Sequence, residues 1–269
     1  MSAASAPGNA RRWFAEALRH MGHRPRASWR YAVPGFEAAA KRVVDDPETL
    51  RQAKVIYCGT PNTVYRAYLP GVSEDSGGSV AVKWTVGRRQ LVHLVHPTSN
   101  SRESAFYHLL GRLGLPTAEF LAVGEVRIGW RWDHSFTITR FLDDYSGGDD
   151  IDDGRRELFA LTAMRYLAVL HRVRLYHHAY KPKNMLWRAA AGGGIDLRLI
   201  DFGGCGFVRG PLFTRSAMKD LAQFFRNARL SGRLQSECVD AYLDADPGIG
   251  LSRAALIAGV AAVNARKNG

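Results

Sequence analysis

The stretch LYHHAYKPKNMLW, residues 175–187, is followed closely by IDFGG, residues 200–204, and these two pieces decide the fold. Two short apolar runs, separated by the sequence AAAGGG, predict a β-hairpin between them. Asn184 and Asp201 stand at the two ends of this hairpin, so their side chains can converge. Amide and carboxylate oxygens are ligands that suit Mg²⁺. The spacing therefore predicts that Asn184 and Asp201 hold a metal ion.

The segment before this core predicts a mixed lobe of strands and one helix. The alternating runs KVIYCGT, TVYRAYL and SVAVKWTV predict three antiparallel strands, and EFLAVGEVRI and SFTITRFL predict two more after a helix that contains Glu103. A Gly/Ser-rich turn, Gly71 to Gly78, precedes the third strand, and a turn from Trp130 to His134 joins the last two. This order predicts a five-stranded α+β lobe.

The domain organisation follows from composition. The acidic, glycine-rich piece DDYSGGDDIDDG is the clearest linker, which places a boundary near Asp143, and the remaining chain is mainly helical. We expect an N-terminal basic helical extension at 1–53, a strand-rich lobe at 54–142 and a helical lobe at 143–269.

The overall composition indicates a folded and strongly basic protein. Hydrophobic residues make up 46% of the 269 residues, which excludes a chain that is disordered throughout. Lysine and arginine number 37 against 25 aspartate and glutamate, and the resulting net charge of +12 favours an anionic partner. The arginines are spread along the chain without a recognition helix, so nucleic acid is not the expected partner. The three cysteines are far apart and form neither a disulfide framework nor a zinc site.

The first predicted helix, within RRWFAEALRHMGHRPR, is basic and amphipathic. Its apolar stripe either packs on the protein itself or lies in a membrane interface through residues 11–23. No window of the sequence approaches the roughly 20 apolar residues that cross a bilayer.

Lysine and glutamate side chains in the first lobe complete a set suited to phosphoryl transfer, which needs positioned positive charge, a metal site and a group that orients the acceptor hydroxyl. Lys83 ends the AVK strand, from which it can reach phosphate oxygens. Glu103, on the next helix, can hold that ammonium group by an ion pair.

Together, Lys83, Glu103, Asn184 and the DFG sequence at 201–203 resemble the signature of the protein-kinase-like fold. Within that fold, GLPTAEFLAVGE, HHAYKPKN and KDLAQFFRNA resemble the lipopolysaccharide core kinases, the Kdo/WaaP family and its InaA-like branch. The resemblance implies a bilobal fold, the cofactors ATP and Mg²⁺, and phosphorylation of a sugar hydroxyl of a lipid-linked core glycan. It also implies a cytoplasmic protein, with peripheral contact at the cytoplasmic face of the inner membrane as an alternative.

The resemblance further implies a nucleotide site that includes Gly59, Val64, Lys83, Glu103, Arg140 and Leu142. The phosphate loop departs from the kinase pattern, because YCGTPNTVY keeps only Gly59 of three expected glycines, with Tyr57 and Asn62 in the other places.

The catalytic loop departs further, because Ala179 stands where the catalytic aspartate is expected. His178 and Lys181 are the predicted catalytic residues: an imidazole can exchange a proton near neutral pH, and an ammonium group can neutralise the γ-phosphate. The alternative is a pseudokinase that binds nucleotide or glycan without efficient catalysis. The short segment after DFG favours a small-molecule or lipid-linked sugar acceptor over a peptide. Asp220 either anchors the catalytic loop or is a favourable acid near a helix N-terminus.

Overall fold

The computed structural model describes residues 7–22, 24, 28–46, 50, 53–69, 78–87, 96–129, 131–208 and 212–268. The chain divides into two compact units, which are treated separately below. The sheet unit comprises residues 13–112 and 118–143, and the helical unit comprises residues 1–12, 113–117 and 144–269.

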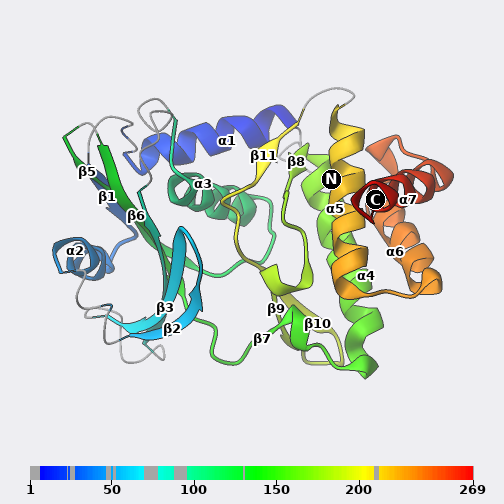
Figure 1. The fold of residues 1–269 in the computed structure, drawn as a ribbon, viewed down its shortest axis with the longest axis horizontal. Coiled ribbons are helices and arrows are strands. Elements are labelled where there is room, and N and C mark those ends of the chain that lie inside the picture. The colour runs from blue at the N-terminus through cyan, green and yellow to red at the C-terminus, as the bar shows by residue number, and fades with distance from the viewer. Residues whose placement is uncertain are drawn as a thin grey trace. The chain divides into compact units, whose positions relative to one another are not determined.

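The sheet unit is built on one antiparallel sheet of six strands, in the order β1-β5-β6-β4-β3-β2. Figure 1 shows this sheet, with all of its strands except β4 labelled. The strands are β1 Trp29–Ala32, β2 Lys54–Cys58, β3 Asn62–Tyr68, β4 Ser79–Val86, β5 Phe120–Ile128 and β6 Arg131–Arg140. The prediction of five strands was therefore wrong by one. The additional strand, β1, lies at the edge of the sheet and pairs with β5, from Trp29 opposite Glu125 to Ala32 opposite Ala122. Most of the predicted Gly71–Gly78 turn, and Trp130, lie outside the described residues.

Helices cover both faces of this sheet. On one face, α2 (Glu37–Asp45) contributes Ala39, Ala40 and Val43 to a buried cluster that includes Val82 and Phe136. On the other face lies α3 (Ser99–Arg112), whose first turns contact β4 and β6 through polar side chains.

The basic amphipathic helix is α1 (Pro7–His20), and its apolar stripe packs on the protein itself. Within the sheet unit, Phe14, Ala17 and Met21 pack against a cluster that contains Ala105 of α3 and Val123 of β5. The rings of Phe14 and Phe106 are 4.6 Å apart. The stripe that suggested a membrane interface is thus largely occupied by intramolecular contacts. Among the described helices, none combines the length and apolar character required of a membrane span.

The helical unit contains four long helices and several short strands. The helices are α4 Asp153–Arg172, α5 Leu212–Ala228, α6 Gly232–Ala245 and α7 Arg253–Asn268. The short elements are β7 Ser146–Gly147, η5 Gly148–Asp150, β8 Leu175–Tyr176, η6 Pro182–Asn184, β9 Met185–Ala189, β10 Ile195–Leu199, β11 Gly206–Phe207 and η7 Pro247–Ile249. The hairpin expected between Asn184 and Asp201 is β9–β10, with Met185 opposite Leu199.

The acidic stretch 143–154, predicted as a linker, is ordered, and from Asp144 onward it lies within the helical unit. Strand β7 pairs with β9, and the indole nitrogen of Trp187 donates to the carbonyl oxygen of Gly147 at 3.1 Å. Asp152 then caps α4 by accepting a hydrogen bond from the backbone nitrogen of Arg155 at 3.0 Å. The polar side chains of the stretch 143–154 thus take part in helix capping and ion pairs, as Asp152 does, and do not mark a solvated linker.

Candidate active site

The loop between β8 and η6 is held in place by a buried aspartate. Asp220 of α5 is fully buried, and it accepts hydrogen bonds from the backbone nitrogens of His177 at 2.9 Å and His178 at 3.1 Å. Helix α5 begins at Leu212, so Asp220 lies well beyond the first turn. Of the two roles open from the sequence, the structure shows that Asp220 anchors the loop.

His177 and His178 have different environments on this loop. The ring of His177 is fully buried, 5.5 Å from the rings of both Tyr180 and Phe202, and burial lowers its pKa. His178 is exposed and has a positive φ of 68°, an uncommon conformation for a residue with a side chain. Its Nδ1 atom is 3.1 Å from the hydroxyl of Tyr176. His177 is thus structural, and His178 is the imidazole that solvent and ligands can reach.

Asn184 and Asp201 converge as the spacing predicted. The Nδ2 atom of Asn184 donates to the carbonyl oxygen of Ala179 at 2.9 Å and lies 3.4 Å from Oδ2 of Asp201. Asp201 also has a positive φ, of 65°, which marks a locally strained turn at the end of the hairpin. The amide group of Asn184 therefore fixes the backbone at Ala179 and leaves Oδ1 as its oxygen donor.

The charge of Lys181 is influenced by another lysine and by two aspartates. Burial, followed by the neighbouring charge of Lys183, lowers the pKa of Lys181, whereas Asp201 and Asp149 act in the opposite direction. The lysine is therefore electrostatically linked to the carboxylate that the sequence assigned to the metal.

In the sheet unit, Lys83 and Glu103 form the predicted ion pair. The Nζ atom of Lys83 is 2.7 Å from Oε2 of Glu103, and the glutamate side chain is 3% exposed. Such a buried carboxylate is stable only when it is paired. The pair fixes the lysine side chain at the centre of the sheet, on the face that α3 covers.

The other predicted nucleotide residues of the sheet unit lie on β3, in the turn before it, and at or just after the end of β6. Val64 lies opposite Lys83 in the β3–β4 register. Gly59 closes a tight turn by donating to the carbonyl oxygen of Asn62 at 2.9 Å, and a Cβ atom there would lie 2.5 Å from the hydroxyl of Tyr57.

Arg140 and Leu142 differ in their side-chain contacts. The guanidinium group of Arg140 contacts Glu119 at 3.1 Å and lies 5.5 Å above the ring of Phe36, while Leu142 follows the strand and is half-buried.

Comparison with known proteins bears on the fold and the family. No curated protein sequence matches the chain. Among solved structures, "WaaP in complex with acyl carrier protein" matches with a TM-score of 0.55 at 19% identity, covering 82% of this chain and 91% of that one. The "Crystal structure of BubR1 kinase domain" matches with a TM-score of 0.37 at 21% identity, covering 56% of this chain and 46% of that one. The likeness to WaaP establishes the kinase-like α+β fold.

The model of the "Lipopolysaccharide kinase (Kdo/WaaP) family" matches residues 81–242, more than half of the chain. The chain belongs to the Kdo/WaaP lipopolysaccharide kinase family. This confirms the resemblance seen in the sequence and makes the chain a phosphotransferase of the lipopolysaccharide kinase type. The Kdo/WaaP match includes Lys83, Glu103, Asn184 and Asp201, and it begins after the phosphate loop.

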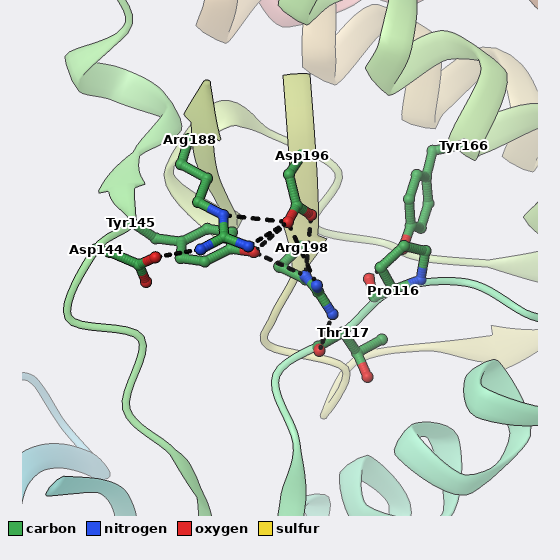
Figure 2. Close-up of polar contacts among 8 residues, drawn as sticks. All are labelled: Pro116, Thr117, Asp144, Tyr145, Tyr166, Arg188, Asp196 and Arg198. Carbon is green, nitrogen blue, oxygen red and sulfur yellow. Dashed lines mark hydrogen bonds and ion pairs between the residues drawn. The ribbon is translucent and has the colours of Figure 1, made fainter. Parts of the chain in front are cut away.

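Sequence reasoning missed one cluster in this Kdo/WaaP protein, shown in Figure 2. Arg188 and Arg198 of the hairpin hold Asp196 between them, each with a nitrogen 3.1 Å from its carboxylate. The hydroxyl of Tyr145 donates to Asp196 and accepts from Arg198 at 3.1 Å. Two further contacts extend the cluster, an ion pair from Arg188 to Asp144 and a 3.5 Å hydrogen bond from Arg198 to the carbonyl oxygen of Thr117.

This cluster fixes two chain segments onto the hairpin that ends in Asn184 and Asp201. The segments are 116–117 and 144–145, and both border the points where the chain passes between its two units. The sequence shows acidic residues in 143–154 and arginines in the hairpin. Composition alone does not show which acidic residue pairs with which arginine.

Proposed function

We propose that this protein is an ATP-dependent kinase that phosphorylates a sugar hydroxyl of a lipid-linked core glycan. The observation that carries the proposal is that a Kdo/WaaP chain holds a lysine–glutamate pair in one unit and an adjacent asparagine and aspartate in the other. The Lys83–Glu103 pair provides a fixed cation at 2.7 Å from its carboxylate, and Asn184 and Asp201 lie together at the hairpin ends. Positioning and electrostatic stabilisation supply most of the catalysis in this class of reaction.

We assign roles in nucleotide binding to residues of each unit separately. In the sheet unit, Lys83 would bind the phosphates, while Gly59 and Val64 would contact the nucleotide from β2 and β3. Leu142, and Arg140 beside Glu119, would contribute from the end of β6. In the helical unit, Lys181 would neutralise charge on the transferred phosphate.

The oxygen donors of Asn184 and Asp201 fit Mg²⁺. Among the described residues, there is no cluster of three or more His, Cys, Asp or Glu side chains able to hold a metal ion. Mg²⁺ needs no such cluster, because it retains several waters and is completed by substrate phosphates. When bound, the ion would neutralise charge on the phosphates. The chain's own part is to present Oδ1 of Asn184, whose Nδ2 is committed to the carbonyl of Ala179, together with the carboxylate of Asp201.

His178 is the side chain we assign to the acceptor hydroxyl. It is exposed, and its backbone nitrogen is fixed by Asp220. In the tautomer in which Nδ1 donates to the hydroxyl of Tyr176, Nε2 is left to accept a proton. A positioned base contributes on the order of a hundred- to ten-thousand-fold to a rate.

Two features support a glycan rather than a peptide acceptor. The first is membership of the Kdo/WaaP family. The second is the short segment between β11, which ends at Phe207, and α5, which begins at Leu212. A segment of this length offers little platform for a peptide, and the net charge of +12 suits an anionic glycolipid at a membrane surface.

The direct test is transfer of label from γ-labelled ATP, with Mg²⁺, to purified lipid-linked core glycan. We expect the parent and Asp240→Ala, a change in a surface ion pair of α6, to label the glycan. Asp201→Ala should not label it. The proposal fails if the parent labels no core glycan while Asp201→Ala binds ATP as tightly as the parent.

Ala179 supports a second candidate, a pseudokinase that binds nucleotide or glycan without efficient turnover. ATP would then raise the melting temperature without transfer. If Ala179→Asp raises a measurable parental rate, the parent is a weakened enzyme, and the pseudokinase alternative is rejected.

A further inference from the structure

A row of polar side chains crosses the sheet beside Lys83. In the strand register Asn62 lies opposite Thr85, Thr85 opposite Ser135, and Ser135 opposite Glu125. Directly paired residues of antiparallel strands face the same side of a sheet. Lys83 is two residues from Thr85 and therefore shares this face. Asn62 thus stands at one end of a polar row that is otherwise buried under α3.

Hydrogen bonds join this row into a chain with one direction. The Nδ2 atom of Asn100, in the first turn of α3, donates to Oγ1 of Thr85 and to Oγ of Ser135, both at 3.0 Å. The hydroxyl of Thr85 has a single hydrogen, which it donates to Oδ1 of Asn62 at 2.8 Å. The amide of Asn62 turns its oxygen towards Thr85. Reversing the whole chain of hydrogen bonds would also turn Asn100, and would place its NH₂ group where its buried Oδ1 atom now lies without a partner.

The same two elements carry the Lys83–Glu103 pair. Lys83 and Thr85 are neighbours on one face of β4, and Asn100 and Glu103 are one turn apart on α3. Two parallel connections, one ionic and one amide to hydroxyl, therefore join β4 to α3. Asn62 is attached to the end of the second connection, so its position is fixed relative to Lys83.

The backbone of Asn62 is also held in place, and the Nδ2 atom of its side chain is available to bind a ligand. The carbonyl oxygen of Asn62 accepts from Gly59 and closes the turn of the phosphate loop. Within the described part of the chain, Nδ2 of Asn62 makes no hydrogen bond, and it is not among the buried polar atoms that lack a partner. Two N–H donors are therefore presented to solvent at the phosphate loop.

We propose that the side-chain amide of Asn62 donates hydrogen bonds to the phosphates of the bound nucleotide. It replaces the backbone amides that a glycine at this position would expose, and Thr85 and Asn100 act as positioning residues that orient it. This inference rests on the proposed kinase function, because it assumes that nucleotide binds beside Lys83. It also explains how a loop with one glycine can still bind phosphate, since the donor comes from a side chain.

The test compares titrations of MgATP and of adenosine into the parent and four variants. Asn62→Asp keeps the oxygen that accepts from Thr85 but loses both donors. Asn227→Asp makes the same chemical change on the exposed surface of α5, where Nδ2 bonds only to the helix backbone at Gln223. Thr85→Val removes the hydroxyl that orients Asn62, and Thr85→Ser keeps it.

We expect Asn62→Asp to weaken MgATP binding about tenfold or more, the scale of a charge-assisted hydrogen bond, with adenosine affinity unchanged. Thr85→Val should weaken MgATP binding by a smaller factor, and Thr85→Ser and Asn227→Asp should match the parent. Unchanged MgATP affinity in Asn62→Asp would overturn the inference, as would equal losses for MgATP and adenosine, which indicate a structural role. A parent that binds no MgATP would instead remove the proposed function itself.

Discussion

Replacement of Asp220 by alanine should destabilise the helical unit strongly, because its carboxylate is the acceptor for a buried backbone turn. The two backbone hydrogen bonds, at 2.9 Å to His177 and 3.1 Å to His178, are joined by a third contact at 3.2 Å from Nε2 of His171. A hydrogen bond to a charged group contributes about 1.5–3 kcal/mol to stability. The two backbone bonds alone therefore amount to about 3–6 kcal/mol.

Part of this cost is offset by relaxation of the loop. His178 holds a positive φ of 68° while its backbone nitrogen is bound, and release of such strain returns about 1 kcal/mol. The expected net loss for Asp220→Ala is then about 2–5 kcal/mol. Asp220→Asn should lose less stability, because its amide oxygen still accepts one of the two backbone hydrogen bonds. Some stability is still lost, because the NH₂ group then faces the other backbone N–H.

Urea unfolding followed by circular dichroism measures this loss as a change in the free energy of unfolding. Asp240→Ala is the matched control, because it removes an exposed carboxylate from its pair with Arg253 and should leave stability close to that of the parent. If Asp220→Ala unfolded within about 1 kcal/mol of the parent, the loop would not depend on this carboxylate.

Three further predictions concern single groups of the helical unit. Because the pKa of Lys181 is below its usual 10.5, its positive charge is lost at lower pH than for an ordinary lysine. The rate of phosphoryl transfer in the parent should therefore decline at a pH below 10.5, and in Lys181→Arg this decline should move to higher pH. If both proteins lost activity at the same pH, the charge of Lys181 would not contribute to the rate. His178→Gly suits the positive φ and removes only the ring, so kcat should fall on the order of a hundredfold with stability retained, while a parental kcat would exclude His178 as the base. Tyr145→Phe removes a hydroxyl that bonds Asp196 and Arg198, and urea unfolding should show a loss of about 1–2 kcal/mol, whereas no loss would mean that the cluster holds without it.

Local signals in the sequence were sufficient for the central hairpin and the helices. The β9–β10 hairpin is formed by adjacent apolar runs and a glycine-rich turn, so Asn184 and Asp201 could be placed together from the sequence alone. Helix α4 has a capping aspartate and a regular apolar spacing, which are also local.

Features that depend on distant partners could not be predicted in the same way. Strand β1 has four residues and is defined by its pairing with β5, about 90 residues later. The stretch 143–154 has the composition of a linker, and its order depends on contacts with Trp187 and Arg188.

Asn62 was read from the sequence as the loss of a glycine. Its contact with Thr85 requires the strand register, and the orientation of its amide requires Asn100 on α3. Asp220 likewise had two roles open until the start of α5 was known.

Calorimetric titration of MgATP into the parent, Lys83→Ala and Asp201→Ala shows whether the chain holds a working nucleotide site. We expect saturable binding by the parent and a large loss of affinity in Lys83→Ala, because the Glu103 pair and the proposed phosphate contact disappear together. Asp201→Ala should show a Mg²⁺-dependent loss. Adenosine should bind both variants as it binds the parent. Parental MgATP affinity in both variants, or no MgATP binding by the parent, would contradict the account.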